Sequence, residues 1–218
     1  MKKFFSFFLF QLTEIKSYQR HIISILITAI FLTSLIYLFS TEIKFKEYSD
    51  LFSKRADTFS YFLTGIIIFE FSFTIVASIG SQIRNLQLNG VLEEIINTHN
   101  DSFTLISMSI FSIYRASLKL VIYFLIGIIF FGLDINFKEF FIILYILAIS
   151  LISLIGISII GASFVLFFKK QNLFNAFYTY ISLIFGGVIF SSKVLPFNLH
   201  IISNLIPLKF QLEATRMV

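Results

Sequence analysis

Residues 87–100 read QLNGVLEEIINTHN and lie between two long apolar stretches of the chain. Asn89 and Gly90 favour a turn. The apolar residues that follow recur at helical spacing on one face, namely Val91, Leu92, Ile95 and Ile96. Two acids come just after the glycine, where a helix dipole favours negative charge. This central loop is therefore predicted to hold a short amphipathic helix in water, which either docks on a partner or simply connects two membrane spans.

The composition predicts an integral membrane protein. The chain has 218 residues, of which 57% are hydrophobic and only 13% charged, including 31 phenylalanines. A soluble domain carries about 25% charged residues. The absence of cysteine excludes disulfides and thiolate chemistry. The net charge of +5 suits anionic lipid headgroups better than nucleic acid, because no basic run exceeds two residues.

The hydropathy pattern predicts an all-α, polytopic helix bundle that forms a single transmembrane domain over residues 1–218. Residues 1–20 mix phenylalanine with basic residues and are predicted to form an interfacial helix. Residues 134–139 are predicted to be a turn that makes a hairpin of the spans on either side. Five apolar runs are long enough to cross a bilayer, at residues 22–39, 59–80, 116–133, 140–168 and 173–190.

Residues 191–218 differ from the rest of the chain. They contain both prolines, Pro196 and Pro207, and between them an apolar run shorter than a membrane span. Such a run favours a re-entrant or interfacial helix pair.

Glu70 interrupts the second predicted span near its middle. A carboxylate at that depth costs at least about 2–3 kcal/mol, so it is expected to face the bundle interior or water. It either contacts a substrate or partner helix, or is a protonated or hydrogen-bonded residue between packed helices. In the fourth predicted span, Ser158 and Ala162 lie four residues apart beside Gly156 and Gly161, which indicates a close-packing face.

The sequence lacks the common motifs of catalysis and nucleotide binding. It contains no phosphate-binding Gly-x-x-x-x-Gly-Lys-Ser/Thr loop, no His-Glu-x-x-His and no Gly-x-Ser-x-Gly. The three histidines, His21, His99 and His200, are scattered over loops and helix ends. We therefore expect no catalytic, cofactor or metal site in this chain.

Three motifs together resemble the permease subunit of type-2 ABC transporters, which are chiefly exporters. The first is GVLE at residues 90–93 with Thr98 further on, which looks like the cytoplasmic signature of that family. The second is GVIF at residues 187–190, followed by Leu-Pro at 195–196. The third is NLIPL at residues 204–208, followed by EATR at 213–216. Their order and spacing extend the resemblance over nearly the whole chain.

The resemblance implies that residues 87–100 are a cytoplasmic coupling helix, seated in a groove of a separate ATPase subunit that would hold ATP and magnesium. The residues it assigns to this coupling are Gly90, Leu92, Glu93, Ile95 and Thr98. It also implies an N-terminus inside the cell, a second permease copy, and a bacterial-type inner membrane as the location. The basic N-terminal segment alone favours the same orientation.

For the tail, the resemblance implies an extracytoplasmic re-entrant segment at residues 191–218 with the motif residues Pro196, Pro207, Glu213 and Arg216. The family continues from this motif into a sixth span. Only two residues follow Arg216 here, so the sixth span is expected to be absent from this sequence.

Two other functions are compatible with the sequence. One is a membrane scaffold or assembly factor that shares the fold. A transport subunit should co-purify with an ATPase and stimulate or require its turnover, whereas a scaffold should not. The other is an intramembrane enzyme that uses Glu70, in which Glu70→Gln would abolish a chemical product without affecting transport.

Overall fold

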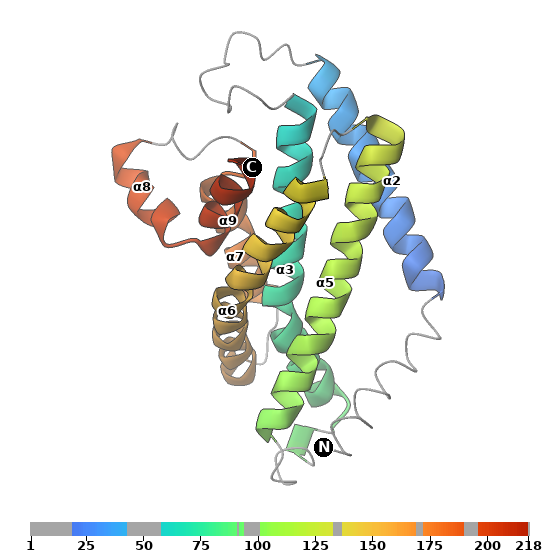
Figure 1. Ribbon diagram of the computed structural model, residues 1–218. Coiled ribbons are helices and arrows are strands. Elements are labelled where there is room, and N and C mark those ends of the chain that lie inside the picture. The colour runs from blue at the N-terminus through green and yellow to red at the C-terminus, as the bar shows by residue number, and fades with distance from the viewer. Residues whose placement is uncertain are drawn as a thin grey trace.

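The structure is a computed structural model that describes residues 19–42, 58–90, 92–93, 101–132, 137–168, 172–189 and 196–217. Residues 1–18 of the predicted interfacial helix and most of the central loop, including Ile95 and Thr98, lie outside the described residues, and residues 19–20 belong to the first described helix. Every regular element in the described part is a helix, which agrees with the predicted fold class (Figure 1).

Four of these helices are long and apolar enough to cross a membrane. They are α2 (Gln19–Glu42), α3 (Thr58–Leu88), α5 (Asp101–Phe131) and α6 (Phe137–Phe168). Three shorter helices follow, α7 (Asn172–Phe185), α8 (Phe197–Asn204) and α9 (Pro207–Arg216). At 1.5 Å per residue, α3, α5 and α6 each exceed the roughly 30 Å thickness of a hydrocarbon core.

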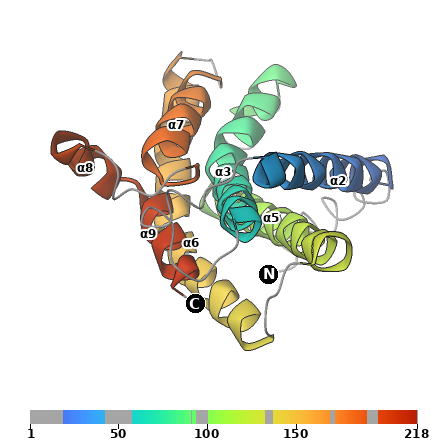
Figure 2. The same ribbon diagram turned by 90° about the horizontal axis from the view of Figure 1, so that it is seen from above.

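Helix α3 is the centre of the bundle. It packs against α2, α5, α6, α7 and α9. Seen from above, α2 and α5 lie on one side of α3, and α6 to α9 lie on the other (Figure 2). The two helices on either side of the predicted turn, α5 and α6, therefore pack mainly on α3, and their mutual contacts include an edge-on pair between the rings of Phe124 and Phe140. Of the turn predicted at residues 134–139, residues 134–136 lie outside the described part, and residues 137–139 are not a turn but already belong to α6.

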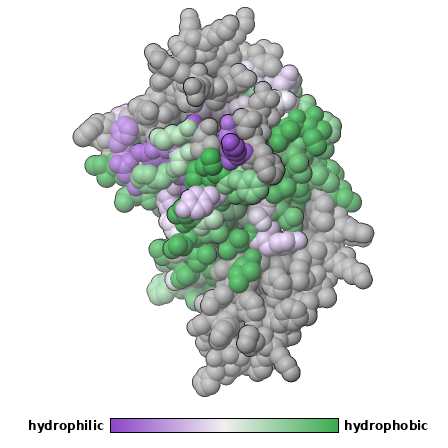
Figure 3. Space-filling view, in the orientation of Figure 1, coloured by the Kyte–Doolittle hydropathy of each residue, from purple (hydrophilic) through white to green (hydrophobic). Residues whose placement is uncertain are grey.

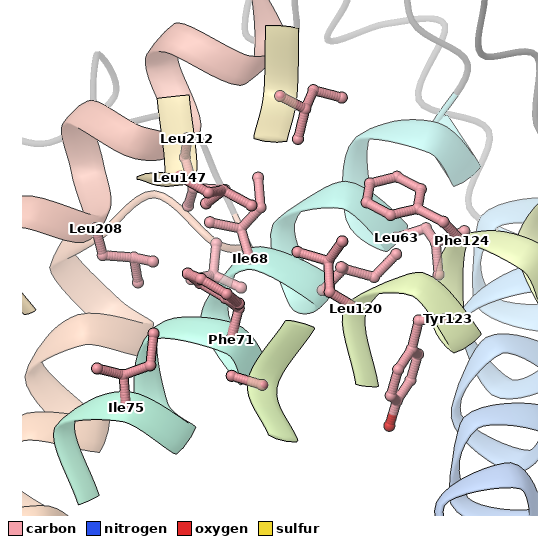
Figure 4. Close-up of a cluster of buried hydrophobic side chains, with 14 of the residues drawn as sticks. Leu63, Ile68, Phe71, Ile75, Leu120, Tyr123, Phe124, Leu147, Leu208 and Leu212 are labelled. Carbon is pink, nitrogen blue, oxygen red and sulfur yellow. The ribbon is translucent and has the colours of Figure 1, made fainter. Parts of the chain in front are cut away.

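The main core surrounds α3 on both sides (Figure 4). In that view Leu63, Ile68, Phe71 and Ile75 of α3 face side chains of α5, α6 and α9. Because lipid tails are as apolar as these side chains, close packing rather than the hydrophobic effect must hold the helices together within a bilayer. Much of the outer surface is correspondingly hydrophobic, and hydrophilic residues gather over α8 and α9 (Figure 3).

An aromatic cluster joins α2, α3 and α5 near the start of α3. The ring of Tyr37 lies 5.6 Å from that of Phe59 and 5.3 Å from that of Phe131. The rings of Phe59 and Phe131 are 5.7 Å apart. Further along α2, the small residues Ala29 and Thr33 are fully buried, so α2 approaches its neighbours closely there.

The predicted close-packing face on α6 is used in part. Ser158 and Ala162 are buried against α3, where the Ile79 backbone N–H donates to Ser158 Oγ at 3.4 Å. A Cβ built on Gly80 of α3 would lie 3.8 Å from the backbone nitrogen of Ala162. Gly156, by contrast, has nothing within 4 Å of such a Cβ, so the interface consists of Ser158 and Ala162 without Gly156.

The predicted count of five spans does not hold for the described helices, because the fifth, α7, has only 14 residues. It spans roughly 21 Å at 1.5 Å per residue. The apolar run continues to residue 190, but the helix ends at Phe185 because the chain turns at two glycines. Gly187 has φ +82°, and a Cβ on Gly186 would overlap the Ser182 carbonyl oxygen and approach Leu208 Cδ2 at 2.9 Å. Helix α7 therefore ends where α9 packs against it, and we call residues 186–189 the turn after α7.

Candidate functional site

The end of α3 is set by Asn89 and Gly90, as the sequence predicted. The backbone N–H of Asn89 donates to the Asn85 carbonyl at 3.0 Å, and that of Gly90 donates to the Gln87 carbonyl at 3.2 Å. Gly90 has φ +70°, a left-handed conformation that glycine adopts without a Cβ penalty. A Cβ at Gly90 would have open space, so the backbone angle, and not crowding, requires glycine here.

Leu92 and Glu93 are helical and are the part of the predicted amphipathic helix that the structure describes. Leu92 is half-buried and packs against a small cluster formed by α3 and α6, consisting of Ile79, Ile83, Ala162 and Val165. Glu93 is exposed. The first apolar residue of the described face therefore anchors the loop to the bundle, and the neighbouring acid faces outward.

Glu70 pairs with a lysine on the next spanning helix. Lys119 Nζ of α5 lies 3.6 Å from Glu70 Oε2, and the two side chains are 30% and 29% exposed. Thr74 Oγ1, one turn along α3, donates to the Glu70 backbone carbonyl at 2.7 Å. The carboxylate thus has a cationic partner for its desolvation, which neither of the two sequence-based interpretations had named.

The tail forms the helix pair that the two prolines indicated. Pro196 occupies the N-cap position of α8, and Pro207 is the first residue of α9, where its missing N–H costs nothing. Ser203 Oγ of α8 donates to the Phe185 carbonyl at the end of α7 at 2.8 Å. The pair is thereby attached to the last turn of the helix before it.

Helix α9 buries polar side chains against the spanning helices. Ser72 Oγ of α3 donates to Gln211 Oε1 at 2.7 Å, and both residues are buried. Lys209, also buried, donates to Asn204 Oδ1 at 2.6 Å and lies 3.8 Å from Glu213 Oε1. Glu213 of the tail motif therefore serves as a counter-ion within its own helix.

Arg216 makes the densest set of contacts among the motif residues. Its Nη1 donates to the Gly187 carbonyl at 2.7 Å, and its Nη2 donates to the carbonyls of Val188 at 3.2 Å and Tyr61 at 3.3 Å. The guanidinium carbon lies 3.5 Å from the centre of the Tyr61 ring. Burial lowers the pKa of Arg216 to about 10, while Tyr61 and then Glu213 act in the opposite direction. The side chain remains charged at neutral pH.

We call Tyr61, Gly187, Val188 and the guanidinium they surround the arginine cage. The motifs identified Arg216 and the glycine but not their contact, and they identified neither Tyr61 nor Lys119. An aromatic residue in the first turn of a span and a lysine inside another are weak signals on their own. Among the described residues no group of three His, Cys, Asp or Glu side chains could hold a metal ion.

A family model described as ABC-2 type transporter matches residues 5–218. No curated protein and no solved structure matches the chain.

Proposed function

The chain belongs to the ABC-2 type transporter family and is a multi-pass permease subunit of an ABC transporter, and we propose that it works in export, driven by ATP hydrolysis in a separate subunit. In this proposal the N-terminus is cytoplasmic and a bacterial-type inner membrane holds two permease copies. The substrate path runs between the copies, and ATP and magnesium bind the partner alone.

The central loop is proposed to couple the ATPase subunit to the spanning helices through Gly90, Leu92, Glu93, Ile95 and Thr98, with Leu92 on the side of the loop that faces the bundle. The observation that carries this proposal is the contact of Leu92 with the α3 and α6 cluster. A movement of the docked loop would be transmitted through Leu92 to two spanning helices that pack on each other. The partner then biases one arrangement of these helices because its closed and open states bind the loop with different affinity.

The tail, residues 191–218, is proposed to be a re-entrant segment on the extracytoplasmic side, with Pro196, Pro207, Glu213 and Arg216 as its structural residues. Support comes from α9, which runs antiparallel to α3: Gln211 bonds Ser72, and Arg216 bonds Tyr61 in the first turn of α3. The start of α3 is opposite to the end that carries the central loop. A re-entrant segment tolerates irregular backbone where that backbone is buried in protein, and Gly186, Gly187 and Val188 after α7 are buried.

The proposed function is tested by affinity purification of the intact chain from its native membrane. We expect an ABC ATPase subunit to co-purify in stoichiometric amount and the complex to hydrolyse ATP. A preparation that contains the folded chain and no ATPase subunit would contradict the proposal and favour a scaffold.

A further inference from the structure

The arginine cage combines groups from three separate segments of the chain. The cation comes from the last residue of α9, one carbonyl and an aromatic face come from Tyr61 of α3, and two carbonyls come from Gly187 and Val188 after α7. A single side chain therefore bridges all three segments. Arg216 thereby connects the turn after α7 (residues 186–189) to the first turn of α3.

The chemistry of the cage suits a planar cation. The carbonyls of Gly187 and Val188 belong to irregular backbone after the end of α7, outside any helix, so the hydrogen-bond donors of a cation can satisfy them. In membrane proteins, unwound carbonyls and the C-terminal ends of half-helices are ligands for cations. The face of an aromatic ring adds cation–π attraction. A guanidinium satisfies these groups with several donors at once, which a point charge such as a lysine ammonium does less well.

The backbone around the cage leaves space for this cation. A Cβ built on Gly65, one turn after Tyr61, would lie 2.8 Å from Arg216 Nη2 and 2.8 Å from the Val188 carbonyl oxygen. Gly187 has a positive φ that lets its own carbonyl reach Nη1. A side chain at Gly65 would therefore push the guanidinium of Arg216 and the turn after α7 away from α3.

We propose that the arginine cage is a guanidinium-binding site that the chain fills with its own Arg216. In this proposal the bound Arg216 is a latch that holds the turn after α7 (residues 186–189) against α3. When Arg216 leaves the cage, the carbonyls of Gly187 and Val188 lose this donor, while the Tyr61 carbonyl still accepts from Thr64 Oγ1. The turn after α7 is then free to move away from α3. This latch does not depend on export or on an ATPase, so it stands or falls separately from the proposed function.

Because the chain contains no cysteine, a single introduced thiol can report on the latch. Val188 is 1% exposed and Ile189, its neighbour, is 48% exposed. In otherwise unchanged protein in lipid bilayers, Val188→Cys should react slowly with maleimide and Ile189→Cys rapidly. Adding Arg216→Ala should accelerate labelling of Val188→Cys by at least about tenfold, since labelling follows the population of the locally open form. Val165→Cys, buried between α3 and α6, should stay protected and so exclude global unfolding.

Chemical rescue separates a binding site from a merely structural arginine. Millimolar guanidinium chloride should restore the slow labelling of Val188→Cys in the Arg216→Ala variant. The same concentration of tetramethylammonium, which has no hydrogen-bond donor, should not restore it. Rescue by guanidinium alone would support the cage, and equal effects of both cations would overturn it.

Gly65→Ala tests the latch without removing Arg216. It should accelerate labelling of Val188→Cys, and guanidinium should not reverse the effect because the added methyl occupies the space. Gly156→Ala, a matched change in α6 with no neighbour within 4 Å, should have no effect. If Arg216→Ala increases the labelling of Val165→Cys as well, that variant has unfolded globally, and Gly65→Ala becomes the test of the latch. Unchanged labelling of Val188→Cys in Gly65→Ala would then overturn the latch.

Discussion

Lys119 Nζ lies 3.6 Å from Glu70 Oε2, on two helices that are each long enough to span a membrane. Both side chains are about 30% exposed, so the pair lies at the edge of the α3 and α5 contact and not in its centre. Neither charge is fully desolvated, and each is the partner that makes the other tolerable at this depth. The pair therefore ties α3 to α5 at modest energetic gain.

Removing both members of this pair should cost less than the sum of the costs of removing each one alone. We expect Glu70→Gln and Lys119→Met each to lower the free energy of unfolding by about 1–2 kcal/mol, a value already reduced for partial exposure. The double variant should lose less than the sum of the two. Equilibrium unfolding of the purified protein in mild detergent measures this. Lys138→Met, at an exposed lysine, is the control, and strictly additive losses would show that the pair contributes nothing.

The two glycines of α6 should respond oppositely to alanine. A Cβ on Gly161 would lie 2.7 Å from Phe174 Cδ1 of α7, whose ring stacks on Phe164 at 5.3 Å. We expect Gly161→Ala to destabilise the protein by about 1–3 kcal/mol through overpacking. Gly156→Ala meets nothing within 4 Å and should be neutral or stabilising, because alanine is the better helix former. Thermal unfolding of the two variants tests this, and equal effects would contradict the close contact between α6 and α7.

Leu92 provides a test of the docking loop. Leu92→Asp would place a charge against the apolar cluster of α3 and α6, and a buried unpaired charge is expensive. We expect the loop to detach from the bundle and co-purification of the ATPase subunit to fall by about tenfold or more. Leu92→Met, which keeps the apolar contact, and Met217→Gln, an 83% exposed site at the other end of the bundle, should leave co-purification unchanged. Full retention of the ATPase by Leu92→Asp would contradict the role of Leu92.

Replacing Arg216 with lysine should make the latch sensitive to pH. Burial lowers the pKa of Arg216 to about 10, so the latched state binds fewer protons than the open state only when the pH approaches or exceeds that value. In the unchanged cage, labelling of Val188→Cys should then be independent of pH between about 7 and 9, after correction for thiolate content. The titratable groups beside this site are the Glu213 carboxylate of the same helix and the Tyr61 phenol of α3, which is neutral in this pH range.

Burial would likewise lower the pKa of a lysine in the latched state, while in the open state its pKa stays at about 10.4, so the two states differ in bound protons in a window below about pH 10.4. Because the latched state then binds fewer protons in this window, a rise in pH favours it. Labelling of Val188→Cys in Arg216→Lys should therefore slow as pH rises from about 7 to 9.5. Labelling that accelerates over this range would contradict burial as the cause, and Ile189→Cys supplies the correction for thiol reactivity.

Features that depend on neighbouring residues in the chain were predictable. Gly90 was assigned to a turn from its sequence context and has a positive φ, and the prolines mark the starts of α8 and α9. Ser158 and Ala162 were identified from their spacing, and they face α3.

Features that depend on distant residues were not predictable. Glu70 and Lys119 are separated by 49 positions, and nothing local to either identifies the other. The early end of α7 has the same origin. The apolar run continues past Phe185, but the turn after α7 packs at Gly186 against Leu208 of α9, which lies more than twenty residues later in the chain. The predicted fifth span was too long for that reason.

Helix α9 has a consequence for how the protein is made. Its inner face carries Lys209, Gln211 and Thr215, all buried, and lipid alone offers these groups no partners. Because α9 follows α3, α6 and α7 in the chain, the ribosome releases it only after these helices have been synthesised. Helix α9 can therefore enter the bilayer only by packing on helices already assembled there, where Ser72 and the cage carbonyls provide partners for its polar groups. Biogenesis of this chain should accordingly include a post-insertional step, in which the polar helix α9 docks onto helices that are already in the membrane and does not partition from the translocon by its own hydrophobicity.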